Sequence, residues 1–266
     1  MIPFLHLGNL QKSFGSVSVL CGVELALFSG EIHGLMGENG AGKSTLIKIL
    51  SGNLMADSIT CTMNGEFLSL VEARQSGQLG MRFIHQELNS IPHLSVAENL
   101  MLGKQLPTRA KIFVNQQKLA ELTRVALAEL GIAHIDPSQR MSRLGAGDQM
   151  LVKLGSAFVV ESGKPSAQLY VLDEPTASLM PSETEKLFAA LERLKQKGSA
   201  ILYVSHRLDE IFQITDRITV LRDGRNTLVE KTEMLKPRTI VEAMTGREIS
   251  QHYPDRSNIL SKEVLL

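Results

Sequence analysis

One stretch of the sequence combines glycines, a lysine and hydroxyl residues at the spacing of a phosphate-binding loop. It fits the pattern G-x-x-x-x-G-K-[ST] and consists of Gly37, Glu38, Asn39, Gly40, Ala41, Gly42, Lys43, Ser44 and Thr45. Because glycines have no side chain, the backbone N–H groups of such a loop can close around phosphate oxygens. Lys43 can reach the β- and γ-phosphates of a nucleotide, and the Ser44 hydroxyl can bind Mg²⁺. The motif therefore predicts a nucleotide-binding site.

Two carboxylates and a histidine follow apolar stretches further along the chain. Asp173 and Glu174 come directly after residues 169–172, and His206 comes shortly after residues 200–204. If both stretches are parallel strands, these side chains reach the edge of the sheet at which open α/β sheets bind ligands. There Asp173 can hold Mg²⁺, Glu174 can activate or position a water, and His206 can contact a γ-phosphate. The alternative is an acidic turn and a structural histidine.

Two further side chains have both a functional and an ordinary interpretation. Gln86 follows the apolar stretch 81–84, so it either reaches a metal-bound water or a γ-phosphate or is an ordinary loop residue. Phe14 is either an aromatic residue of a hairpin or core, or a ring that stacks on adenine.

These residues need strands and helices to position them. Apolar residues 32–36 lead into the phosphate loop, and residues 46–50 after it predict a helix, which is the context that the motif requires. Strands at 2–8 and 23–28 and a hairpin at Asn64-Gly65 predict an antiparallel layer beside a parallel core. A second hairpin is predicted around Asp223-Gly224.

The middle of the chain reads as helical. A helix cap at Ser95, a helix over 117–130 and a helical pattern over 150–160 predict a helical subdomain over 95–160. Further helices are predicted over 183–197 and 237–244. The predicted fold class is α/β: a P-loop NTPase core with a parallel sheet, an N-terminal antiparallel β layer and a helical subdomain.

The amino-acid composition limits the classes of protein to which this chain can belong. The chain has 266 residues, of which 43% are apolar, which suffices for one large domain or a domain with a subdomain. With 28 basic and 28 acidic residues, no global field favours nucleic acid or an anionic membrane. Cys21 and Cys61 lack metal-ligand spacing and are expected to be reduced thiols. The sequence predicts neither a transmembrane helix nor a signal peptide.

The order of the motifs along the whole chain resembles the ATP-binding cassette (ABC) ATPases. Residues 37–44 look like their Walker A loop, Gln86 like their Q-loop, and residues 169–174 like their Walker B strand and catalytic glutamate. His206 looks like their switch histidine. Their signature, LSGGQ, corresponds here to Leu144, Gly145, Ala146, Gly147, Asp148 and Gln149. The resemblance implies ATP and Mg²⁺ as cofactors, with Glu174, His206 and Gln86 in catalysis and Ser44, Asp173 and Gln86 at the metal.

Several motifs resemble in sequence the corresponding motifs of the sugar-importer ATPases of the ribose, galactose and arabinose type, which carry two cassettes in one chain. This chain resembles the first cassette, with an ABC domain over 1–246, a helical insertion at about 95–160 and a linker over 247–266. The implied function is the ATP-hydrolysing, energy-coupling subunit of a monosaccharide importer, peripheral to the cytoplasmic face of the cell membrane. The implied partners are membrane permease subunits, a second and different cassette and, indirectly, an extracytoplasmic sugar-binding protein, with no nucleic acid.

Two positions depart from the family pattern. Gly145 stands where the signature usually has Ser, which removes a hydroxyl that would bind a γ-phosphate, and Met180 stands where many ABC proteins have Asp. In ABC dimers each ATP lies between one Walker A loop and the partner's signature, so an altered signature beside an intact loop favours a different cassette as partner. The alternatives are a soluble ABC ATPase of DNA repair or translation and an ATP-binding regulatory module without turnover. The sequence lacks the coiled-coil or basic insertions of the first, and Glu174 argues against the second.

Overall fold

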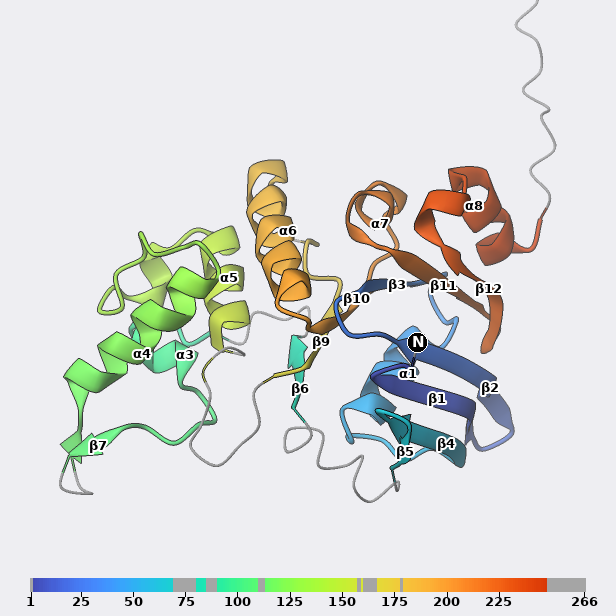
Figure 1. The fold of residues 1–266 in the computed structure, drawn as a ribbon, viewed down its shortest axis with the longest axis horizontal. Coiled ribbons are helices and arrows are strands. Elements are labelled where there is room, and N and C mark those ends of the chain that lie inside the picture. The colour runs from blue at the N-terminus through green and yellow to red at the C-terminus, as the bar shows by residue number, and fades with distance from the viewer. Residues whose placement is uncertain are drawn as a thin grey trace, which may run out of the picture.

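The computed structural model describes residues 2–68, 80–84, 90–109, 113–156, 159, 167–177 and 179–247. Gln86 and the expected linker beyond residue 247 lie outside the described residues. Within them, the chain forms two main sheets with helices packed on and beside them (Figure 1). None of the described helices is long and apolar enough to cross a bilayer.

A six-stranded sheet forms the centre of the fold, with the strand order β12-β11-β3-β10-β9-β6. Five strands are parallel to their neighbours, and β12 pairs antiparallel with β11 through the predicted hairpin at Asp223-Gly224. Every residue of β3 and β10 is buried, as expected for a parallel sheet that is covered on both faces. The strands are β3 (Ile32–Gly37), β6 (Met81–Ile84), β9 (Leu169–Asp173), β10 (Ala200–Val204), β11 (Arg217–Arg222) and β12 (Arg225–Lys231).

The predicted antiparallel layer is confirmed as a four-stranded sheet with the order β2-β1-β4-β5. Its first two strands are longer than predicted. The outer half of β1 is largely polar and shifts its register against β2, so it lacks the apolar alternation of a half-buried strand. The Asn64-Gly65 turn joins the last two strands, and both residues have positive φ angles. The strands are β1 (Leu5–Phe14), β2 (Val17–Leu27), β4 (Ser58–Met63) and β5 (Glu66–Phe67).

Successive side chains of the parallel strands enter two different apolar cores. Leu35 and Leu202 pack with helix α1 (Lys43–Leu50) and the antiparallel layer. Their neighbours Met36 and Tyr203 face the other core, which the remaining helices cover (Figure 1). The helices that come after β9 in the sequence are α6 (Pro181–Gln196), α7 (Leu208–Ile214), the short 3-10 helix η2 (Thr232–Met234) and α8 (Pro237–Thr245). This alternation gives the molecule its layers, because side chains of a strand point alternately to the two faces.

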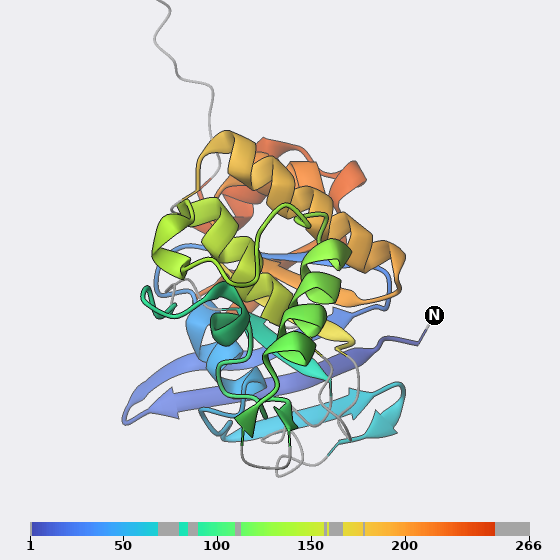
Figure 2. The same ribbon diagram turned by 90° about the vertical axis from the view of Figure 1, so that its left-hand side faces the viewer.

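The helical part lies beside the β6 edge of the sheet and in front of it in the turned view (Figures 1 and 2). Ser95 caps its first helix with a complete capping box, as the predicted cap requires. The helix predicted over 150–160 begins earlier, at Ala146, and is described to Ser156, because Gly147 weakens the helical signal of its first turn. Residues 157, 158 and 160 lie outside the described residues. The elements are α3 (Val96–Leu100), β7 (Thr108–Arg109), β8 (Phe113–Val114), α4 (Gln116–Glu129), η1 (Met141–Arg143) and α5 (Ala146–Ser156).

Candidate nucleotide-binding site

The phosphate loop joins β3 to α1, as its motif predicts. A Cβ atom at Gly37 would collide with the carbonyl oxygen of Leu221, and one at Gly42 would lie 2.6 Å from the Leu20 side chain. Gly42 also has a φ of 106°, which a residue with a side chain rarely adopts. The glycines are therefore required by backbone conformation and by close packing against β2 and β11.

Lys43 lies inside this loop and is 8% exposed. Its ammonium donates hydrogen bonds to the carbonyl oxygens of Gly37 at 2.6 Å and Glu38 at 3.0 Å. Burial lowers the pKa of Lys43, while the nearby carboxylates of Glu174 and Asp173 raise it and so favour the charged form. The loop thus holds a cation beside the first turn of α1, whose N–H groups receive no side-chain cap. Free helix N–H groups and a lysine together suit a phosphate group.

Glu174 and His206 meet at the carboxyl ends of β9 and β10. The parallel register places Val204 opposite Asp173, and the Glu174 N–H donates to the Val204 carbonyl at 2.9 Å. Glu174 has a φ of 46°, a left-handed conformation that turns the chain sharply at the strand end. Its Oε1 then lies 2.9 Å from His206 Nδ1. The expected carboxylate and histidine therefore form a pair although 32 positions separate them.

A cavity of about 480 Å³ opens where these elements converge. Gly37, Glu38 and Asn39 of the loop line it together with Glu174 and His206. Met244 of α8 also lines it. The sequence did not mark Met244 as a site residue, because its place depends on how α8 packs beside β11. The cavity brings five of the predicted site residues to one opening.

The donors around this opening fit a Mg²⁺-bound nucleoside triphosphate. The backbone N–H groups and Lys43 suit phosphate oxygens, while the Ser44 hydroxyl and the Asp173 carboxylate supply the oxygen ligands that Mg²⁺ prefers. Among the described residues, no group of three or more His, Cys, Asp or Glu side chains is arranged to hold a metal ion. A metal bound through one hydroxyl, one carboxylate and substrate phosphates needs no such cluster.

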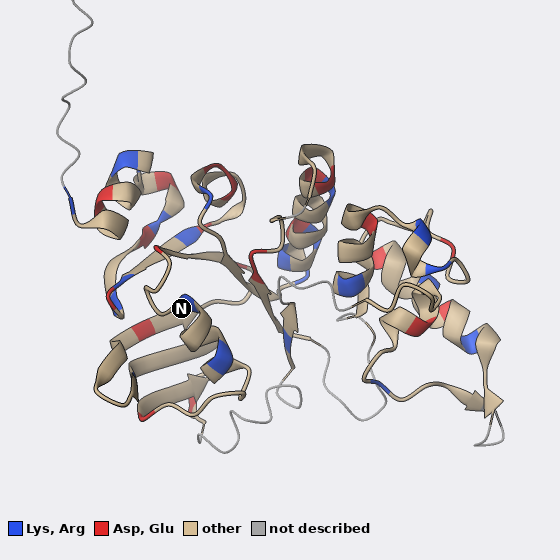
Figure 3. Ribbon diagram, turned by 180° about the vertical axis from the view of Figure 1, so that it is seen from behind, with Lys and Arg blue, Asp and Glu red and all other residues tan. Residues whose placement is uncertain are grey.

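Phe14, another predicted site residue, is not among the described residues that line this opening. Phe14 is half exposed at the end of the β1–β2 hairpin, and the Lys12 ammonium lies 5.4 Å from its ring centroid. Its contact with adenine stays a prediction. Gln86 is outside the described residues. Lys and Arg residues are interspersed with Asp and Glu over the described elements rather than gathered on one of them (Figure 3).

The expected signature residues lie at the start of α5 in the helical part, separate from the phosphate loop. Gly147 N–H donates to Glu183 Oε1 at 3.0 Å, and a Cβ atom at Gly147 would lie 2.5 Å from that side chain. A Cβ atom at Gly145 would lie 3.6 Å from Glu183 Oε1, which is ordinary contact, so a serine fits there. The signature turn thus rests on the first turn of α6, a contact that its sequence motif does not indicate.

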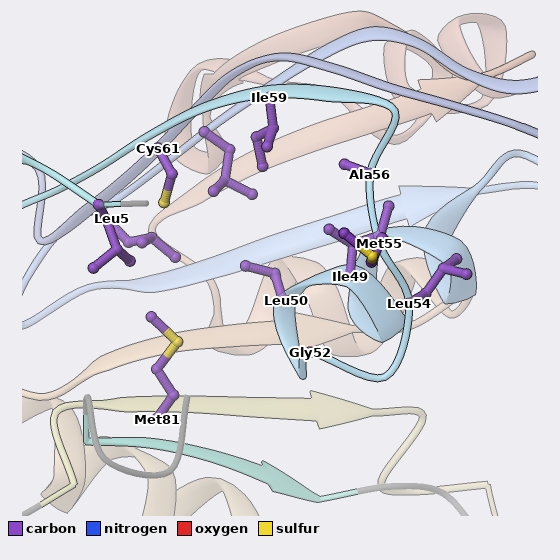
Figure 4. A pocket seen from close by; sticks show the side chains of 12 residues that line it. Leu5, Ile49, Leu50, Gly52, Leu54, Met55, Ala56, Ile59, Cys61 and Met81 are labelled. Atoms are coloured by element: carbon purple, nitrogen blue, oxygen red, sulfur yellow. The ribbon is translucent and has the colours of Figure 1, made fainter. Parts of the chain in front are cut away.

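A second pocket lies between α1, β1 and β4, where apolar side chains point toward one another (Figure 4). Its volume is about 30 Å³, the space of roughly one water molecule. The buried Cys61 thiol faces it, and burial raises the pKa of this thiol to about 11, so it stays protonated. Its small volume and apolar lining identify it as a packing gap rather than a nucleotide site.

Comparisons with known proteins agree with this geometry. Residues 20–177 match the family described as ABC transporter. An arabinose import ATP-binding protein of Rhizobium johnstonii is 43% identical over 94% of this chain and 48% of its own length. A ribose import ATP-binding protein of Oceanobacillus iheyensis is 39% identical over 97% of this chain and 50% of its own length. The chain therefore spans about half the length of the curated relatives that it matches.

Solved structures show the same fold. An ATP-binding cassette of an ABC transporter in its ADP conformation aligns with a TM-score of 0.78 and 25% identity, covering 93% of this chain and all of that one. A nucleotide-free ATP-binding cassette from an ABC transporter aligns with a TM-score of 0.77 at 24% identity, covering 92% of this chain.

Proposed function

The chain belongs to the ABC transporter family of ATP-binding cassettes, and on that premise we propose that it binds and hydrolyses ATP as the energy-coupling part of a monosaccharide importer. The single observation that carries the hydrolytic function is the 2.9 Å pair of Glu174 and His206 at the mouth of the phosphate-loop cavity. The names of the relatives, which are arabinose and ribose import proteins, support the sugar class.

In this proposal each described site residue has a defined role. Lys43 and the first N–H groups of α1 bind the β- and γ-phosphates. Ser44 and Asp173 hold Mg²⁺, which neutralises charge on the phosphates when bound. Glu174 orients a water and accepts its proton as the water oxygen bonds to the γ-phosphorus and the bond to the ADP oxygen breaks. His206 holds Glu174 in place and contacts the γ-phosphate. Gln86 and Phe14 are proposed for the metal side and for adenine stacking.

A single cassette presents half of two sites, so the proposed working unit has two cassettes. Residues 1–246 form the cassette with its helical insertion at about 95–160, and residues 247–266 form a linker. Its partners are membrane permease subunits, a second cassette with an intact signature and, indirectly, an extracytoplasmic sugar-binding protein. The chain would then act at the cytoplasmic face of the membrane as a peripheral subunit. Nucleic acid is not proposed as a partner, because the 28 basic and 28 acidic residues create no global field that favours it.

Transport in membrane vesicles tests this function. The chain is co-expressed with the permease and second-cassette components of ribose, galactose and arabinose importers, and ATP-driven uptake of each labelled sugar is measured. Uptake of at least one sugar that depends on this chain and is lost with Glu174→Gln is the expected result. ATP hydrolysis without uptake of any sugar would contradict the importer, and absence of both would contradict the ATPase.

A further inference from the structure

Glu210, near the start of α7, is a buried carboxylate surrounded by hydrogen-bond donors and is 2% exposed. Thr176 Oγ1 donates to it, 2.8 Å from each carboxylate oxygen. The Tyr203 hydroxyl donates to Oε2 at 2.8 Å and the Ser205 hydroxyl at 3.1 Å. Arg207 Nη1 lies 2.9 Å from Oε1. These contacts give both oxygens of the buried carboxylate hydrogen-bond partners, as a buried polar group requires.

The partners of Glu210 come from the two loops that carry the Glu174–His206 pair. Thr176 is two positions after Glu174 in the turn beyond β9, and Ser205 directly precedes His206 beyond β10. Tyr203, on β10, is the third partner. Its burial raises the pKa of its phenol most, and the nearby Glu210 carboxylate raises it further, so the phenol stays protonated and donates its hydrogen bond. The Glu210 carboxylate therefore accepts hydrogen bonds from both loops.

Glu210 lies among the buried residues, and it is not among the residues that line the phosphate-loop cavity. Any effect of Glu210 on the site therefore passes through the residues with which it forms hydrogen bonds. Resting on the proposed hydrolysis, we propose that Glu210 is a positioning residue, which fixes the loops of Glu174 and His206 so that these two side chains remain paired. Thr176 anchors the first loop, and Ser205 and Arg207 anchor the second.

The isosteric variant Glu210→Gln tests this role, because glutamine keeps an oxygen acceptor for the hydroxyl donors but removes the charge facing Arg207. A merely structural carboxylate serves as the control. Asp216 accepts from the Ile32 N–H at 2.8 Å and from Lys195 at 2.7 Å, at the opposite end of β3 from the phosphate loop. Asp216→Asn thus weakens the same sheet without touching the loops of the site.

Single-turnover hydrolysis and ATP affinity are measured separately, below the melting temperature of every variant. With Glu210→Gln the rate at saturating ATP is expected to fall on the order of 10- to 100-fold, as misplacement of reacting groups does, while the ATP affinity stays within about twofold. In a Glu174→Gln background the same change should cost less than about threefold, because its effect passes through Glu174. Asp216→Asn should lower the melting temperature and leave the rate unchanged. A wild-type rate with Glu210→Gln, or a full further loss in the Glu174→Gln background, would overturn the proposal.

A second measurement does not depend on activity. The imidazole ¹⁵N chemical shifts of His206 report its contact with Glu174, and a Glu174→Ala variant gives their values without that contact. Glu210→Gln should move the shifts toward those values, and Asp216→Asn should not. Unchanged shifts would overturn the positioning role even if the wild-type chain showed no hydrolysis, an outcome that would count separately against the proposed ATPase.

Discussion

Replacing Glu174 by glutamine is expected to preserve the structure of the site while removing its chemistry. Glutamine has the size of glutamate, and its amide can remain within hydrogen-bond distance of His206 Nδ1, now 2.9 Å from Glu174 Oε1. The left-handed φ of 46° costs both side chains alike. The Glu174 N–H bond to Val204 is made by the backbone and is unaffected. Melting temperature and Mg-ATP affinity should therefore stay close to wild type.

The rate of hydrolysis should fall by at least about 100-fold, since general base catalysis typically contributes 10²- to 10⁴-fold. At 1.36 kcal/mol for each factor of ten, that range corresponds to about 2.7–5.4 kcal/mol of activation free energy. The loss should fall on the chemical step alone, because the groups that hold the phosphates, Lys43 and the first turn of α1, are unchanged.

Single-turnover hydrolysis of pre-bound radiolabelled ATP measures this step directly. Glu185→Gln is the matched control, because Glu185 is an exposed carboxylate on α6, outside the lining of the cavity. The control should hydrolyse ATP at the wild-type rate. A Glu174→Gln rate within a few-fold of wild type would refute the assignment of Glu174 as base and move that role elsewhere, with His206 as the next candidate.

Three further outcomes are expected. Lys43→Ala should weaken ATP binding by roughly 10- to 150-fold or more, because hydrogen bonds to charged groups contribute about 1.5–3 kcal/mol each, with an unchanged circular dichroism spectrum; an unchanged affinity in nucleotide titration would contradict the role of the loop. The chain alone should be a slow ATPase, and Gly145→Ser should accelerate it, since a serine fits at that position and restores a hydroxyl toward a partner's phosphate. Fast, cooperative turnover of the wild-type chain that Gly145→Ser leaves unchanged would contradict the idea that the altered signature limits hydrolysis. Burial lowers the pKa of His33 from its ordinary 6.5 despite its contact with Glu31, so the unfolded chain takes up a proton first. The free energy of unfolding should therefore fall as pH drops below about 6.5, by up to about 1.4 kcal/mol per pH unit; urea unfolding at several pH values should show a shallower slope for His33→Asn, and equal slopes would exclude this histidine.

Much of the site could be predicted from the sequence because its signals are local. The phosphate loop is written in nine consecutive residues between a strand and a helix, and the short-range geometry of that unit places the glycines and Lys43. The Asn64-Gly65 hairpin and the capping box at Ser95 are likewise set by residues within one turn of each other. The apolar stretches around 169–173 and 200–204 were recognisable as buried strands for the same reason.

Only the tertiary structure decided which of these pieces meet. The register of β9 against β10 brings Glu174 to His206, and that register depends on packing on both faces of the sheet rather than on either segment alone. The burial of Glu210 between two loops, and of the Gly147 N–H against Glu183, likewise depends on how α7 and α6 dock. The pattern of apolar residues in a segment indicates which of its side chains are buried. It does not indicate which distant segment they contact, because that contact forms only when the sheet and helices pack together. The sequence therefore determined the chemical groups of the site and the strands that carry them, and the packing of the sheet and its helices decided how those groups are paired.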